Sequence, residues 1–196
     1  MKKEIIRKLL HLAGYWNLAA FIIISEFIGE KIAFLFLTLV LLLLLELEYL
    51  RVEHGLLQMP PKFNIFRKKE QSAFGGHIFM TLAAIVCFAA FSRAIATAAF
   101  SMTILGDIFA ALIGKKWGRF RFIFSNKTLE GTLAGFGANI FAGYFFLNSL
   151  NNFWLILLAM AATASIVEVF TQKLDDNLTV AIFAGVCGQV IFLLLR

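Results

Sequence analysis

The sequence predicts an all-α integral membrane protein with about seven transmembrane helices. Hydrophobic residues make up 61% of the chain and charged residues only 15%, so the outside of the folded protein must be apolar as well as its inside. Seven apolar runs, each about as long as a bilayer is thick, take up most of the 196 residues. Because this leaves no room for a second domain, we expect residues 1–196 to form a single polytopic membrane domain.

The apolar runs give the expected helices in chain order. The first carries Arg7, Lys8 and His11 and is followed by no small-residue cleavage site, so we expect it to remain in the mature protein. The second is almost entirely leucine and is the clearest, whereas Gly106-Asp107 interrupts the fourth and suggests a broken or kinked helix. The expected spans are residues 5–25, 31–50, 74–92, 94–114, 129–149, 153–171 and 178–195.

The distribution of Lys and Arg orients the protein. Apart from Lys31, Arg93 and Arg196, these residues lie at the N-terminus or in loops on the same side of the membrane. Basic loops stay in the cytoplasm, which places the N-terminus inside and the C-terminus outside. The long loop of residues 52–73 mixes apolar and basic side chains, so we expect it to lie along the cytoplasmic interface. It is either a connector held by anionic lipid or an entry ramp for a lipid substrate.

Composition argues against nucleic-acid binding and thiol chemistry. The net charge of +6 comes from basic residues scattered among hydrophobic runs, without an aromatic and basic RNA-binding motif. Cys87 and Cys187 lie inside apolar runs with no neighbouring His or Cys, so we interpret both as packing residues.

A set of polar residues approaches the cytoplasmic face from three separate regions of the sequence. Acids and a lysine are costly beside an apolar phase, so they indicate a functional site. Nucleoside triphosphates and magnesium are found on that side of the membrane. The candidate active-site segments are residues 106–132 and 168–178, and the set is Asp107, Lys127, Glu130, Glu168, Asp175, Asp176 and Asn177.

Small residues recur every four positions in the fourth span and form one smooth helical face. This stripe comprises Gly106, Ala110, Gly114 and Gly118, and it allows another backbone to approach closely, either within the protein or in a homodimer. Asp107 lies beside the stripe, where a carboxylate needs a cation.

The segment from Lys127 to Thr132 opens the fifth span. Lys127 and Glu130 lie three apart on one helical face, and Thr128 is suited to cap the helix. The pair is either a local ion pair, or Lys127 and nearby backbone N–H groups such as that of Gly131 hold phosphates.

The triplet of Asp175, Asp176 and Asn177 precedes the last span and supplies its N-cap. Capping needs only one of the three residues. With Glu168 one or two turns upstream, the segment provides more oxygen ligands than capping uses, and oxygen-rich clusters suit magnesium.

These segments together resemble the polyprenol kinase family, which includes dolichol kinase, phytol kinase and CTP-dependent diacylglycerol kinase and is related to phosphatidate cytidylyltransferases. The resemblance covers almost the whole chain and rests on the order and spacing of the segments. The matching segments are Arg7 to His11, Gly106 to Arg119, Lys127 to Thr132, and Glu168 with Asp175 to Leu178.

The resemblance implies a kinase that transfers the terminal phosphate of CTP to the hydroxyl of a membrane lipid alcohol at the cytoplasmic face, with magnesium. Asp107 with Asp175 or Asp176 would bind the metal, and Glu168 or an Asp would accept the alcohol proton. The residues expected to bind the nucleotide and its phosphates are Gly106, Gly114, Gly118, Arg119, Lys127, Thr128, Glu130, Gly131 and Asn177. The residues expected near the lipid substrate are Arg7, Lys8 and His11.

Two other functions stay open at this point. A phosphatidate cytidylyltransferase-like CDP-lipid synthase would use a similar metal-bound CTP, but the longer charged C-terminal signature of that family is absent here. A small ion-coupled transporter could use Asp107 and Glu168 as a cation path, but the sequence shows no convincing internal repeat and its acids gather toward one face.

Overall fold

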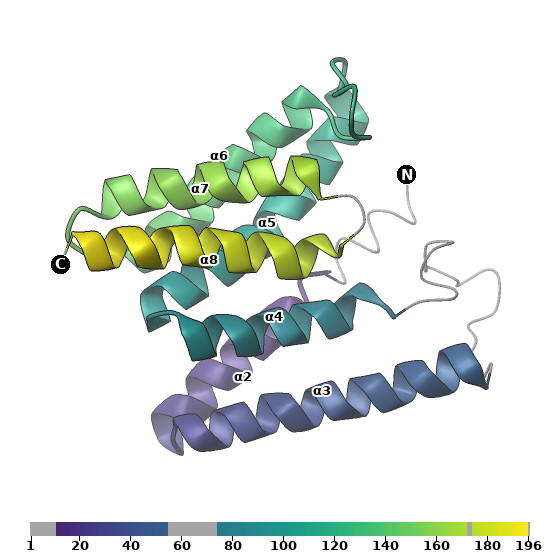
Figure 1. Cartoon of the computed structure of the whole chain (residues 1–196), viewed down its shortest axis with the longest axis vertical. Coiled ribbons are helices and arrows are strands. Elements are labelled where there is room, and N and C mark those ends of the chain that lie inside the picture. The colour runs from purple at the N-terminus through teal and green to yellow at the C-terminus, as the bar shows by residue number, and fades with distance from the viewer. Residues whose placement is uncertain (1–10, 55–73, 172–173, 196) are drawn as a thin grey trace. The chain divides into compact units, whose positions relative to one another are not determined.

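The described part of the computed structural model, residues 11–54, 74–171 and 174–195, is helical and contains no β-strand. Every one of the seven expected spans contains a helix, so the predicted all-α class is confirmed. The helices shown in Figure 1 are α2 Gly14–Phe27, α3 Glu30–Glu53, α4 Gly76–Ala90, α5 Arg93–Trp117, α6 Leu129–Leu147, α7 Phe153–Phe170 and α8 Asp176–Leu194.

Four of the described helices, α3, α5, α7 and α8, are long and apolar enough to cross a membrane, judged by length and composition. Helix α4 is apolar but shorter. The number of seven spans and the orientation of the termini stay predictions.

The chain divides into two compact units, Met1–Ile85 and Val86–Arg196, and the division falls inside α4. In the first unit, α2 packs against α3, with the Phe21 ring edge-on to Phe34 at a centroid distance of 5.0 Å. Only a few residues of α3 are buried, and its other face exposes a row of leucines of the kind that lipid covers. The expectation of a single domain stays a prediction.

A buried carboxylate joins the end of α3 to the start of α4 within the first unit. Glu48, 4% exposed, accepts hydrogen bonds from Arg51 Nε at 3.0 Å and from the backbone N–H of Gly75 at 3.0 Å. His77 Nε2 lies 3.6 Å from the same carboxylate. These contacts stabilise a carboxylate whose burial in apolar surroundings would otherwise cost free energy.

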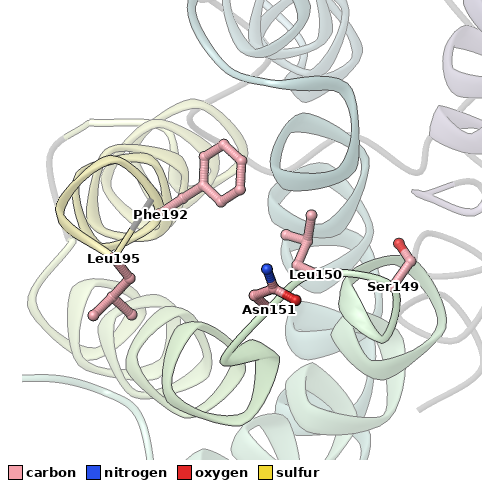
Figure 2. Close-up of a pocket in the computed structure, with 5 residues that line it drawn as sticks. All are labelled: Ser149, Leu150, Asn151, Phe192 and Leu195. Carbon is pink, nitrogen blue, oxygen red and sulfur yellow. The ribbon is translucent and has the colours of Figure 1, made fainter.

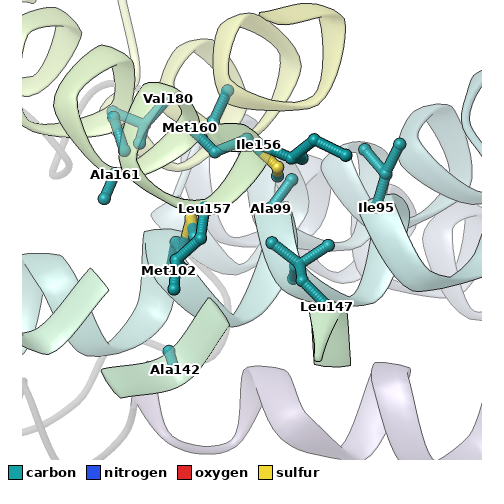
Figure 3. Packing of buried hydrophobic residues seen from close by; sticks show 13 residues of the cluster. Ile95, Ala99, Met102, Ala142, Leu147, Ile156, Leu157, Met160, Ala161 and Val180 are labelled. Carbon is teal, nitrogen blue, oxygen red and sulfur yellow. The ribbon is translucent and has the colours of Figure 1, made fainter. Parts of the chain in front are cut away.

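The second unit is built around α5, which contacts α6, α7 and α8. Its N-terminal half is almost entirely buried, and Figure 3 shows Ile95 and Met102 of α5 among Ile156, Leu157 and Met160 of α7. Helices α7 and α8 run antiparallel side by side (Figure 1). This core packs together α5, α6, α7 and α8, the helices whose ends carry the candidate site.

Helix α5 continues through Gly106-Asp107 without interruption over its 25 residues, so the expected break is wrong, and a kink stays a prediction. Gly106 serves packing, because a Cβ at this position would collide with the side-chain amide of Asn139 on α6. Asp107 is therefore presented from a continuous helix.

The small-residue stripe of α5 packs against α6. A Cβ on Gly131 would lie 2.6 Å from the carbonyl oxygen of Ala110 and 3.0 Å from the Cα of Gly114. A Cβ on Gly135 would lie 3.2 Å from the carbonyl oxygen of Gly106. Internal packing of the stripe, one of the two interpretations open from the sequence, is therefore confirmed, and a homodimer stays a prediction.

This close approach predicts that Gly131→Ala destabilises the protein. Forcing a methyl group against backbone atoms in a packed interface costs about 1–3 kcal/mol, and the midpoint of thermal unfolding in detergent should fall. The matched control is Gly137→Ala in the same helix, where a Cβ meets nothing within 4 Å; it should be neutral or stabilising by up to about 1 kcal/mol. Equal effects of the two changes would contradict the packing of α5 on α6.

Candidate functional site

A short hairpin between α5 and α6 presents Lys127. The backbone N–H of Phe122 donates to the carbonyl of Lys127 at 3.1 Å, and the N–H of Leu129 donates to the carbonyl of Phe120 at 2.9 Å. A β-bridge pairs Arg121 with Thr128. The chain therefore turns back at once after α5, and Lys127 stands directly before the first turn of α6.

Glu130 and Thr128 hold this hairpin in place. The Glu130 carboxylate accepts from the backbone N–H groups of Arg119 at 2.9 Å and Phe120 at 3.2 Å. The Thr128 hydroxyl accepts from the N–H of Gly131 at 3.2 Å, which confirms the predicted N-cap. Glu130 is thus engaged by the hairpin backbone, and a contact between Glu130 and a nucleotide stays a prediction.

Lys127 joins the hairpin to the ends of two distant helices. Its Nζ lies 2.7 Å from Glu168 Oε1, across 41 residues of sequence, and 3.7 Å from Asp176 Oδ2. The Glu168 side chain is 7% exposed, whereas those of Lys127 and Asp176 are about 30% exposed. The predicted convergence of these three residues is present, although Lys127 pairs across helices and not with Glu130.

The start of α8 follows the predicted capping pattern. Asp175 Oδ1 accepts from the backbone N–H of Asn177 at 3.0 Å and from its side-chain Nδ2 at 2.8 Å. The side-chain carbonyl oxygen of Asn177 is buried and has no hydrogen-bond partner. A buried acceptor of this kind is suited to a ligand, because leaving it unsatisfied costs free energy.

The acids are close enough to influence one another. Burial raises the pKa of Asp175 from 3.8 to about 6, and the charges of Asp176 and then Asp107 add to the effect, against the hydrogen bonds from Asn177. Asp107, 8% exposed on α5, also acts electrostatically on Glu168. Acids from α5, α7 and the start of α8 therefore form one electrostatic cluster around Lys127.

Oxygen donors of the type that magnesium prefers are present in this cluster. Within residues 11–54, 74–171 and 174–195, no three His, Cys, Asp or Glu side chains form a ready-made metal site. Magnesium usually takes only one or two protein carboxylates and completes its shell with water and substrate phosphates. Asp107 with either Asp175 or Asp176, together with the unsatisfied oxygen of Asn177, would supply that number of donors.

The other predicted site residues are distributed as follows. Gly106, Gly114 and Gly131 lie in the contact between α5 and α6, and a Cβ on Gly118 would collide with the carbonyl of Gly114 and lie 2.6 Å from the Thr128 side chain. Direct contact of these glycines with a nucleotide stays a prediction. His11 belongs to the first unit. Arg7, Lys8 and residues 55–73 lie outside the described residues.

Sequence reasoning missed a buried polar pair behind the site. Asn139, 1% exposed on α6, donates from Nδ2 to the Ser165 hydroxyl on α7 at 3.1 Å, and its own carbonyl oxygen has no hydrogen-bond partner. Ser165 lies one turn before Glu168 on the same helix. A lone Asn in the glycine-rich run of α6 was the available signal, but its partner depends on the packing of α6 against α7.

A cavity of about 270 Å³ lies away from this cluster, at the turn between α6 and α7 and the end of α8 (Figure 2). Among the described residues, no titratable side chain lines it. Its lining residues are Ser149, Leu150, Asn151, Phe192 and Leu195. The cluster of acids around Lys127 is therefore a better candidate for the active site than this cavity is.

The raised pKa of Asp175 predicts how stability changes with pH. The folded protein binds this proton more tightly than the unfolded chain, so the free energy of unfolding should fall as pH rises from about 4 to about 6. Asp175→Asn retains a capping side chain but removes the charge.

In the absence of divalent ions, Asp175→Asn should therefore be more stable than the wild type at pH 8, by about 3 kcal/mol, with the difference closing toward pH 4. Thermal unfolding in detergent at a series of pH values measures this difference. A variant that is less stable than the wild type at pH 8 would show that Asp175 stabilises the fold as a charged group.

The chain is similar in part to a curated protein. Over 81 residues, which make up 38% of this chain and 35% of the other, it is 40% identical to the phytol kinase of Synechocystis sp.. The match thus spans about a third of that protein's length. No family model and no solved structure matches the chain.

Proposed function

We propose that this protein is a membrane-embedded lipid-alcohol kinase that transfers the terminal phosphate of CTP to the hydroxyl of an isoprenoid alcohol such as phytol, geranylgeraniol or a polyprenol. The observation that carries the proposal is the contact of Lys127 with Glu168 and Asp176 beside Asp175. Phosphoryl transfer depends mainly on positioning and charge neutralisation, and this cluster offers both cationic and anionic groups. The partial similarity to a phytol kinase supports the same reaction class.

Lys127 is the phosphate-binding group in this proposal. Its side chain is about 30% exposed, and the one short ion pair of its ammonium with a described residue is that to Glu168. A nucleotide phosphate is a stronger partner, because it offers several charged oxygens at once. The basic side chains of Arg119, Lys115 and Lys116 lie on the hairpin or the last turn of α5 and raise the local potential for an anion.

Asp107 with Asp175 or Asp176 would hold a magnesium ion, with Asn177 Oδ1 as a further oxygen donor. The ion, when bound, neutralises charge on the β- and γ-phosphates and favours the displacement. The protein contributes the position of these oxygens: α5 fixes Asp107, and the cap of α8 fixes Asp175.

Glu168 would accept the proton of the lipid alcohol. In the described state its carboxylate is paired with Lys127. When the ammonium turns toward a phosphate, this carboxylate loses its partner. It is then a free base close to the phosphate that Lys127 binds. The binding of the nucleotide and the release of the base are thereby coupled through one side chain.

The location of the reaction follows from the same groups. The Lys and Arg distribution supports a position of this end of the second unit at the cytoplasmic surface, where CTP would be available. The outer faces of α7 and α8 carry exposed apolar side chains, including Ile166, Leu158 and Val190, so a hydrocarbon tail can stay in the bilayer while the hydroxyl reaches the cluster.

Transfer of label from CTP tests the proposal. Purified protein in liposomes with magnesium and γ-labelled CTP should convert one alcohol from a panel of phytol, geranylgeraniol, a polyprenol and diacylglycerol into a labelled lipid phosphate. Asp107→Asn should lower turnover by at least about 100-fold, because charge stabilisation in phosphoryl transfer is worth several kcal/mol.

The control for this assay is Glu30→Gln, which neutralises an exposed acid at the start of α3 and should leave turnover unchanged. The thermal midpoint of each variant shows whether it is folded. Label that enters lipid only from α-labelled CTP with phosphatidate would identify a CDP-lipid synthase instead. A folded Asp107→Asn variant with near-normal turnover would exclude the metal role.

A further inference from the structure

Two phenylalanine rings stack between the segments that carry Lys127 and Glu168. The ring centroids of Phe124 and Phe170 are 5.1 Å apart, and the ring planes differ by 6°. Phe124 precedes Lys127 by three residues in the hairpin, and Phe170 is the last residue of α7, two residues after Glu168. The same two segments are therefore joined twice, once by an ion pair and once by an aromatic stack.

Both rings keep much of their surface exposed. Phe170 is 65% exposed and Phe124 is 51% exposed, although stacking against each other covers one face of each ring. Phe122 lies near Phe124, with centroids 5.7 Å apart and planes tilted by 32°. The stack is thus backed by the hairpin, while much of the surface of Phe170 is uncovered.

We propose that the Phe124–Phe170 pair is the platform on which the base of the bound nucleotide stacks, with the outer face of Phe170 as the contact surface. This inference rests on the proposed kinase function, because Lys127 would hold the phosphates of the same nucleotide. Both rings come from the segments that carry Lys127 and Glu168, so a nucleotide held by its phosphates brings its base close to these segments.

The chemistry of the platform defines its selectivity. Aromatic side chains bind nucleobases through their flat faces, and this contact tolerates any base because every base has a π-face. The platform therefore supplies affinity for the nucleoside portion, and it distinguishes a nucleotide from a base-free phosphate compound.

Comparing CDP with pyrophosphate tests the platform directly. CDP carries the base and two phosphates, whereas pyrophosphate has the phosphates alone. Binding of each to the full-length protein in detergent with magnesium is measured by calorimetry. Phe170→Ala should weaken CDP binding about tenfold, in line with the loss of one base–aromatic stack, and should leave pyrophosphate binding unchanged. Phe170→Trp should bind CDP at least as tightly as the wild type.

Two further variants control for packing. Phe170→Leu keeps apolar bulk without a π-face and should weaken CDP binding as Phe170→Ala does, even if the alanine variant is unstable. Ile166→Ala removes another apolar side chain, 56% exposed, one turn earlier on α7. It should change the affinity for neither CDP nor pyrophosphate.

The outcomes separate the alternatives. Equal weakening of CDP and pyrophosphate by Phe170→Leu would overturn the platform and show that the ring acts by clamping the hairpin. Unchanged affinity for both, with a raised KM for the lipid alcohol, would overturn it in favour of a lipid contact. A wild-type protein that binds neither CDP nor pyrophosphate would overturn the kinase proposal itself, and the platform with it.

Discussion

The second unit depends on one electrostatic constraint: a carboxylate buried at the end of an apolar helix must have a cation. Glu168 is 6% exposed, and leaving its charge uncompensated there would be strongly destabilising. Lys127 meets this need from 41 residues away, which requires the hairpin to turn back over the end of α7. The cap at Thr128, the backbone contacts of Glu130 and the close approach of α5 and α6 all serve to bring that ammonium to its position.

The same constraint links the fold to the proposed chemistry. An ion pair made by a lysine that keeps part of its surface in solvent can be exchanged, because an incoming phosphate offers the ammonium an equivalent or better partner. The carboxylate then becomes available for a proton. Asp175 is similar: its burial, and then the nearby charges of Asp176 and Asp107, raise its pKa, so that holding it ionised costs stability. Charges that oppose folding are common where a protein binds ions or substrates.

Much of the fold could be predicted from the sequence because the membrane fixes the length of each element. The apolar runs matched the helices within a few residues at most described ends, and the caps at Thr128 and Asp175 followed from local side-chain chemistry. The expected break at Gly106-Asp107 was wrong, since glycine there accommodates the amide of Asn139. Local sequence contains no information on which residue of α6 will lie opposite Gly106.

The partners within the site were harder to predict for the same reason. The sequence spacing of Lys127 and Glu130 allowed a local ion pair, but the hairpin offers Glu130 two backbone N–H groups and leaves Lys127 for Glu168. The pairs Asn139–Ser165 and Phe124–Phe170 each join segments far apart in the chain. Their residues look ordinary in an apolar sequence until packing brings them together.

A double-mutant cycle on Lys127 and Glu168 tests the central claim most directly. Turnover would be measured for Lys127→Met, Glu168→Gln and the combined variant, with the thermal midpoint as a check on folding. If the two side chains act as one exchangeable unit, each single change should lower turnover by at least about 100-fold and the combination should add little further loss. Losses that multiply, or a single variant with near-normal turnover, would contradict the coupling of phosphate binding to the release of the base.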